Sequence, residues 1–114
     1  MAIPSGSGTE VLKRAVIDGA NNTTSTIFTV PAHHIYTVLT ISIFNNDSAV
    51  RDFNIYLDTT GSNNIFIQKA TSLSDETCFV WSDRFVATAG DILKIGSSST
   101  EIDIICSYID QDWS

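Results

Sequence analysis

Basic residues are scarce in this sequence. Lys and Arg together number 6 against 13 Asp and Glu, so the 114-residue chain has a formal net charge of −7. A protein that binds nucleic acid or an anionic lipid surface needs a basic face that neutralises phosphates. The composition therefore argues against a nucleic-acid partner and against a membrane partner.

Cysteine is almost as rare, with Cys78 and Cys106 as the two examples. They form no CxxC spacing, so we expect neither a zinc site nor a redox site, and no cofactor. Both lie inside expected strands and would form a disulfide only if those strands were close together. We favour two free thiols that pack as small apolar side chains, and a disulfide remains the alternative.

Long apolar runs are also missing. No window contains 18 uninterrupted apolar residues, so we expect no transmembrane helix. The first nine residues contain neither a basic segment nor an apolar segment of the kind that starts a secretory signal. We therefore expect the chain to be made, or assembled, in a reducing cytoplasm.

Leucine is sparse, whereas β-branched residues are abundant. The chain has 5 Leu against 15 Ile, 7 Val and 13 Thr. Stiff β-branched side chains favour strands, and no segment shows a sustained helical period. Eight strands are expected at about residues 10–18, 25–30, 35–44, 51–58, 65–70, 76–82, 92–95 and 101–109. These observations predict an all-β fold, a two-sheet antiparallel β-sandwich or jelly roll.

The expected domain organisation is simple. Residues 1–9 form an N-terminal arm, residues 10–110 the β-sandwich, and residues 111–114 a C-terminal tail. Alternation predicts which side chains of two strands point inward. They are Phe53, Ile55 and Leu57 in one strand, and Ile102, Ile104, Cys106 and Tyr108 in the other.

No residue pattern indicates catalysis. His33 and His34 are adjacent, so on an extended chain they point to opposite sides, and we expect both on an exposed bend. The acidic residues fall at turns or on outward strand positions, and no calcium-binding loop or serine nucleophile motif is present. We therefore expect no enzyme, although spacing alone leaves a glycosidase-like carboxylate pair open.

Several apolar residues are candidates for an interface. Between residues 78 and 81, alternation puts Cys78 and Val80 on one face and Phe79 and Trp81 on the other, so one pair points outward. Exposed apolar groups gathered in a patch usually mark a partner surface. The predicted interface residues are Ile3, Pro4, Phe79, Trp81, Ile105, Ile109 and Trp113. The alternative is that these side chains cover the edges of the core.

Four segments together resemble a known group of proteins. They are Thr26–Pro31, Ile35–Asn46, Ala87–Ile95 and Glu101–Ile109. In this order they are similar to small tailed-bacteriophage virion β-sandwich proteins, which are capsid decoration (cement) proteins or tail-associated modules. In that group a T-x-Y/F-T-V-P strand precedes a long apolar strand, and an A-G-D-x-I/L turn leads to a last strand ending in S-Y. The bend at His33 and His34 departs from the group, which more often has small or basic residues there.

The resemblance implies a function and partners. The chain would be a capsid decoration protein that binds the outer shell as a homo-oligomer, commonly a trimer. Its partner would be the major capsid protein or a tail protein, in a virion assembled in the host cytoplasm. The alternative is a tail or fibre module that binds a host receptor or glycan. Aromatic side chains at Tyr36, Tyr56, Trp81 and Trp113 would then stack on sugars.

Overall fold

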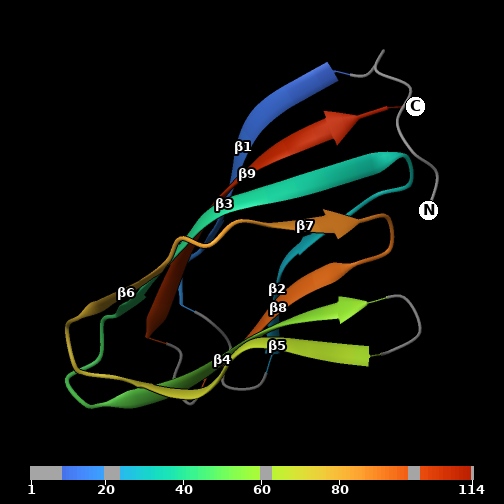
Figure 1. Ribbon diagram of the computed structural model, residues 1–114. Coiled ribbons are helices and arrows are strands. Elements are labelled where there is room, and N and C mark those ends of the chain that lie inside the picture. Colours follow the sequence, from blue (N-terminus) through green and yellow to red (C-terminus); the bar gives the residue numbers. More distant parts are fainter. Residues whose placement is uncertain (1–8, 20–23, 60–62, 98–100, 114) are drawn as a thin grey trace.

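The structure is a computed structural model that describes residues 9–19, 24–59, 63–97 and 101–113 (Figure 1). All regular elements in these ranges are strands, and no described helix is long and apolar enough to cross a membrane. The strands are β1 (Thr9–Ile17), β2 (Thr24–Thr29), β3 (His34–Asn45), β4 (Arg51–Thr59), β5 (Asn63–Leu73), β6 (Cys78–Trp81), β7 (Phe85–Thr88), β8 (Ile92–Ser97) and β9 (Ile102–Asp112). Ile3 and Pro4 lie outside the described residues.

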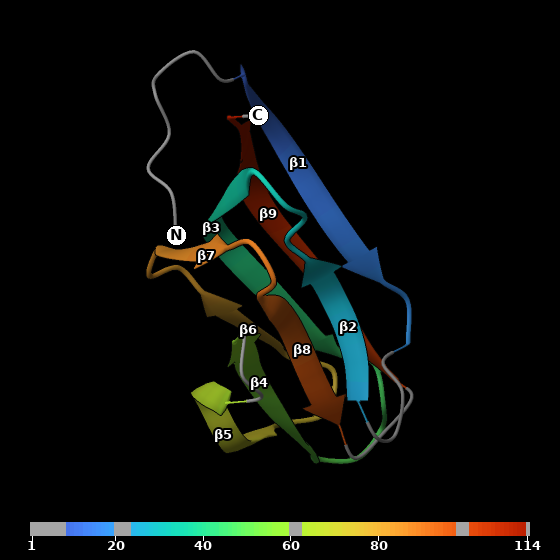
Figure 2. The same ribbon diagram turned by 90° about the vertical axis from the view of Figure 1, so that its right-hand side faces the viewer.

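The strands form two antiparallel sheets that lie against each other as layers (Figures 1 and 2). The five-stranded sheet, called sheet A here, has the order β1-β9-β3-β6, and β7 also pairs with β3. β6 and β7 lie end to end along one side of β3, opposite residues 41–44 and 35–38. The four-stranded sheet, called sheet B, has the order β2-β8-β4-β5. The all-β sandwich expected from the sequence is therefore confirmed.

The core lies between the two sheets. Alternate residues of the central strands point into it, so that Phe53 and Ile55 of β4 meet Ile41 and Ile43 of β3 in one buried cluster. Fully burying an Ile or Phe side chain contributes about 1.5–3 kcal/mol. The expected inward set is confirmed, because Phe53, Ile55, Ile102, Ile104, Cys106 and Tyr108 are buried and Leu57 packs against the cluster.

The strands differ in two notable ways from the sequence-based expectation. The described residues form nine strands, because Phe85–Thr88 forms β7, which was not among the eight expected strands. β9 continues through Asp112, so residues 111 and 112, assigned above to a tail, pair with β1 and β3.

Both cysteines are free thiols. Cys106 is buried in the core, and this burial raises the pKa of its thiol to about 12. Cys78 is exposed on β6, which is at the margin of sheet A.

Candidate functional site

The outer face of sheet A is unusually apolar for a surface that faces solvent. The strand registers place Val16 of β1, Ile105 of β9, Ser42 of β3 and Val80 of β6 side by side in one row. Directly opposed residues of an antiparallel pair point to the same face of the sheet. Three of these four side chains are large, apolar and exposed, with Ile105 at 46%. Together they form an apolar row that crosses the sheet from edge to edge.

A second apolar row runs parallel to the first. It contains Leu12 of β1, Ile109 of β9, Thr37 of β3 and Val86 of β7. Leu12 is 70% exposed and Val86 is 54% exposed. We call the two rows together the apolar face, defined by Leu12, Val16, Val80, Val86, Ile105 and Ile109.

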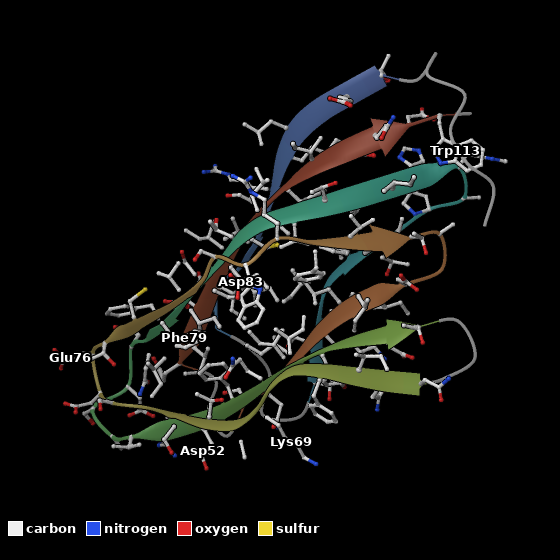
Figure 3. The ribbon with its side chains drawn as sticks, in the orientation of Figure 1. Asp52, Lys69, Glu76, Phe79, Asp83 and Trp113 are labelled. Carbon is white, nitrogen blue, oxygen red and sulfur yellow. The ribbon has the colours of Figure 1, made fainter. Side chains whose placement is uncertain are left out.

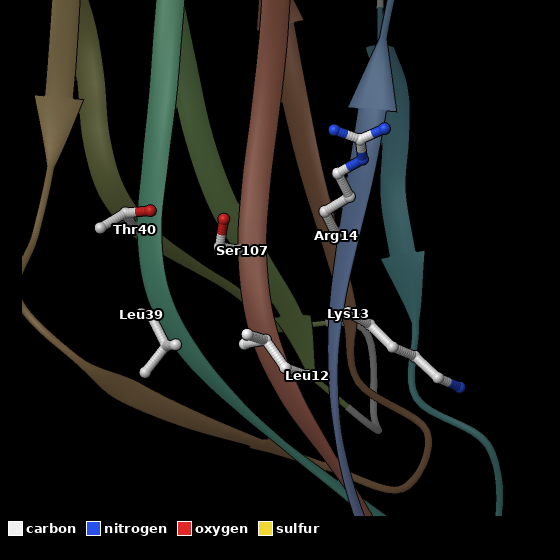
Figure 4. A pocket seen from close by; sticks show the side chains of 6 residues that line it. All are labelled: Leu12, Lys13, Arg14, Leu39, Thr40 and Ser107. Atoms are coloured by element: carbon white, nitrogen blue, oxygen red, sulfur yellow. The ribbon is translucent and has the colours of Figure 1, made fainter.

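A shallow hollow lies between the two rows (Figure 4). Its volume is about 550 Å³, and it is lined by Leu12, Lys13, Arg14, Leu39, Thr40 and Ser107. Ser107 lies between Arg14 and Thr40 in the strand register, so a small side chain occupies the middle of the sheet there. The register of β3 and β9 also shifts between Val38 and Thr40, next to Leu39. The small residue and the bulge together account for the depression.

The outer face of sheet B has a different chemistry. Lys94 of β8 pairs with Asp58 of β4 at 3.0 Å, and Ser72 of β5 bonds Asp52 of β4 at 2.9 Å. The Lys69 ammonium lies 4.9 Å from the centre of the Phe66 ring. Asp52 and Lys69 point away from the core in Figure 3. The outer side of sheet B thus combines polar contacts with the exposed Phe66 ring, whereas sheet A presents the rows of the apolar face.

A charged cluster stands at one end of sheet A. The buried Asp110 carboxylate accepts hydrogen bonds from Lys13 Nζ at 2.7 Å and lies 2.6 Å from His34 Nδ1. Burial alone would raise the pKa of this carboxyl, but the bonds from Lys13 and His34 outweigh it and lower the pKa. The bond to Asp110 raises the pKa of Lys13 in turn. The cluster therefore joins β1, β9 and β3 by charge.

This cluster does not match a metal centre. The other ring nitrogen of His34 lies 3.8 Å from Asp112, so the two carboxylates contact different sides of the imidazole. Within the described ranges, no group of three or more His, Cys, Asp or Glu side chains is placed to hold a metal ion. The sequence expectation for the histidines holds in part, because His33 is exposed at the bend but His34 is half-buried in β3.

The structure separates the residues predicted above for the interface. Ile105 and Ile109 lie on the apolar face. Phe79 and Trp81 instead point inward and pack against the core, with the Phe79 ring 5.6 Å from that of Phe53 (Figure 3).

Trp113, the last described residue, lies apart from the apolar rows. It packs edge-to-face on His33 at 5.2 Å, and its backbone N–H donates to the His33 carbonyl at 3.0 Å. These two contacts of Trp113 therefore hold the end of β9 against the bend before β3.

Sequence reasoning missed four of the six residues of the apolar face. The four are Leu12, Val16, Val80 and Val86. Alternation indicates which residues of one strand share a face, but it does not show which strands are neighbours in the sheet. One signal was available between residues 78 and 81. Burying Phe79 and Trp81 removes more apolar area from water than burying Cys78 and Val80, so the aromatic pair was the better candidate for the core.

Comparisons with known proteins identify the fold class. No protein-family model and no curated protein matches the sequence. Among solved structures, a chain of the Bacillus endospore appendages, described as disulfide-linked pili, matches with a TM-score of 0.57 and 17% identity. The match covers 100% of this chain and 97% of that one. The fold is a jelly-roll-like β-sandwich.

Two chains of infectious bursal disease virus share the jelly-roll-like sandwich. The Gx strain matches with a TM-score of 0.53 and 12% identity over 98% of this chain and 32% of that chain. The T13 viral particle matches with a TM-score of 0.51 and 11% identity over 91% of this chain and 31% of that chain. The present chain thus spans about a third of each viral chain. Identities this low establish a shared architecture, and function has to be argued from the surface.

Proposed function

We propose that this protein is a non-enzymatic structural subunit that attaches to a protein shell through the apolar face of sheet A. The observation that carries the proposal is that exposed aliphatic side chains from β1, β9, β6 and β7 line up in two rows on the outer face of sheet A. An exposed apolar patch on a small domain is typical of a partner surface. The hollow fits this role, because the described residues that line it include no carboxylate that would act in acid–base chemistry.

The kind of partner follows from the fold and the sequence resemblance. The sandwich is shared with chains of a pilus and of a viral particle. The sequence pattern is similar to that of tailed-bacteriophage decoration proteins. We therefore infer a capsid decoration or cement protein in a virion, with the major capsid protein as its partner. A tail protein is the alternative partner.

The size of the outer face of sheet A bears on how the protein docks on a shell. Four strand positions about 4.8 Å apart and strands about 30 Å long give the whole outer face roughly 550 Å². A specific interface buries about 800 Å² on each partner, so one copy alone falls below the usual size. An oligomer of this chain would compensate for weak single contacts, because its linked copies bind the shell together.

The test compares two sets of substitutions to Thr, which is β-branched like Val and Ile and has nearly the shape of Val. The triple variant Val16→Thr, Ile105→Thr and Val80→Thr makes the first apolar row polar. The control variant Val50→Thr and Ile65→Thr changes two exposed apolar residues away from that face, with exposures of 58% and 55%. Each substitution in the row should weaken docking by about 1 kcal/mol or more, because a hydroxyl replaces a methyl group of Val16 and Val80 and the ethyl group of Ile105.

Binding is measured by co-sedimentation with gradient-purified particles of the virus that encodes the protein. We expect the triple variant to bind about 100-fold more weakly, which corresponds to about 3 kcal/mol, and the control to bind like the wild type. Equal binding by the triple variant and the wild type, or no binding by the wild type, contradicts the proposal.

One observation favours a second function, a fibre module that binds glycans. Tyr56 and Phe66 form a ring pair with centroids 5.4 Å apart on the outer side of sheet B, beside Lys69. Aromatic rings next to polar groups are suited to stacking on sugars. Binding on a glycan array that is lost in Phe66→Ala but kept in the triple variant would favour this function over shell attachment.

A further inference from the structure

The free edge of β1 differs from the other sheet edges. β1 ends the strand order of sheet A and pairs with β9 over nine residues without a register shift. The edge of sheet B at β2 contains a register shift, and the edge at β5 contains two and a positive φ of 49° at Ala70. The far edge of sheet A is divided between two strands of four residues each, β6 and β7.

An open and regular edge can accept another strand. Natural proteins interrupt sheet edges with bulges, short strands and charges to prevent pairing with other chains. Three of the four edges here are interrupted by register shifts or short strands, whereas β1 is regular and carries charges of both signs. Residues Thr9 to Arg14 of β1 are all exposed, and β1 lies at the margin of the molecule in Figures 1 and 2.

We propose that a second copy of this chain pairs with β1 edge to edge, antiparallel, about a two-fold axis beside Leu12. In this register Leu12 faces Leu12 of the second copy. Glu10 faces Arg14 of the second copy, and Arg14 faces its Glu10. Glu10, Leu12 and Arg14 alternate along β1, so they share one face of the sheet. This is the outer face of sheet A, because Leu12 lies opposite Ile109 of the apolar face.

Among axes beside residues 10 to 14 of β1, the charges favour this register. An axis beside residue 10, 13 or 14 would place Glu10, Lys13 or Arg14 opposite its own copy, and like charges directly opposed are destabilising. An axis beside Val11 would place Glu10 opposite Leu12. The axis beside Leu12 makes two opposite-charge pairs and leaves Lys13 facing Val11. Lys13 is already neutralised within its own chain by Asp110 at 2.7 Å.

The pairing gives a dimer with one continuous sheet. A two-fold contact uses the same patch on both copies and closes after two of them. It therefore predicts a dimer in place of the trimer that the sequence resemblance implies. The inference does not rest on the proposed function, because it concerns the edge of sheet A and the proposed function concerns its face.

Charge exchange tests the pairing. The mass in solution is measured by sedimentation for the wild type, for Glu10→Arg, for Arg14→Glu and for the double exchange Glu10→Arg with Arg14→Glu. The wild type should have about twice the 12.4 kDa mass of the chain. Each single exchange sets like charges opposite each other and should raise the dimer dissociation constant at least tenfold. The double exchange should restore it, which also shows that the altered strand still folds.

Cross-linking tests the register itself. In a Cys78→Ser background, Leu12→Cys should give a disulfide-linked dimer under mild oxidation, because directly opposed Cβ atoms lie about 5 Å apart. Val16→Cys is the matched control and should not cross-link, since four residues on each side of the axis separate the two thiols by roughly 26 Å.

The outcomes separate this inference from the proposed function. A monomer or trimer, failure of the double exchange to restore the dimer, or a dimer that Leu12→Cys does not cross-link overturns the edge pairing. None of these results depends on particle binding. Loss of particle binding in the Val16, Ile105 and Val80 triple variant tests the face and leaves the mass measurement unaffected.

Discussion

Replacing Asp110 by Asn tests the charged cluster that joins β1, β9 and β3. The carboxylate is 4% exposed and accepts a hydrogen bond from Lys13 while lying 2.6 Å from His34. Asn has nearly the same shape and keeps one acceptor oxygen, but it carries no charge. The substitution therefore removes the electrostatic part of both contacts with little change in packing.

The expected loss is moderate. A hydrogen bond to a charged group contributes about 1.5–3 kcal/mol, and the asparagine oxygen retains part of it. Lys13 is 45% exposed, so its ammonium regains water when the carboxylate is neutralised. We expect the free energy of unfolding to fall by about 2 kcal/mol at pH 7. For a domain of this size that corresponds to a fall of about 8 °C in the melting temperature.

The loss should depend on pH. The folded-state pKa of Asp110 lies below its ordinary 3.8. A carboxylate with a lowered pKa stabilises the fold above its unfolded pKa, and that contribution disappears as the pH falls through the folded-state value. The stability difference between wild type and Asp110→Asn should therefore be full at pH 7 and shrink below about pH 4.

Urea unfolding followed by the fluorescence of Trp81 and Trp113 measures both effects. Asp58→Asn is the matched control, because Asp58 pairs with Lys94 at 3.0 Å where both side chains are more than a fifth exposed. An ion pair of that kind contributes about 0–1 kcal/mol. If Asp110→Asn costs no more than Asp58→Asn at pH 7, or if its cost is the same at pH 3, the assigned role of the cluster is wrong.

Two further predictions concern buried groups. Asn45 is fully buried, and its side-chain amide donates to the carbonyls of Ala49 at 2.9 Å and Leu73 at 3.0 Å. Asn45→Ala leaves these carbonyls without that donor and should lower the free energy of unfolding by about 2–3 kcal/mol in urea titrations, whereas Asn46→Ala at the exposed neighbouring position should not. A thiol reagent at pH 8 should modify Cys78 alone in the folded protein, because burial raises the pKa of Cys106 to about 12. Two thiols should react in urea, and rapid reaction of both in buffer would contradict the buried position of Cys106.

The sequence was sufficient for the fold class and for the inward faces of two strands. Alternation is regular in β4. In β9, Ile102, Ile104, Cys106 and Tyr108 form an entirely apolar set, whereas the other set also contains Asp103 and Ser107, so the first set was the better candidate for the core. β6 was ambiguous because both of its faces carry apolar residues. The structure buries the face with the larger aromatic side chains, Phe79 and Trp81, and leaves Cys78 and Val80 outside.

The candidate site could not be predicted from the sequence, and the reason is different. Val16, Val80 and Ile105 come from three strands separated by many residues, and they form a row only through the order of strands in sheet A. Alternation shows the face of one strand but not its neighbours, because strand order depends on the packing of the whole chain. The Lys13–Asp110 pair joins residues 97 positions apart and depends on the same pairing.

β1 and β9, the first and last described strands, are neighbours, and this position affects how the domain folds during synthesis. β9 is paired on both sides, with β1 and with β3. Sheet A therefore stays divided until β9 has left the ribosome, and β3 exposes an open edge until then. Contacts between such distant segments slow folding and prolong the time during which unpaired strands can aggregate. Deleting β9 should therefore leave two unconnected parts of sheet A, whereas deleting an outer strand such as β5 would leave sheet A intact.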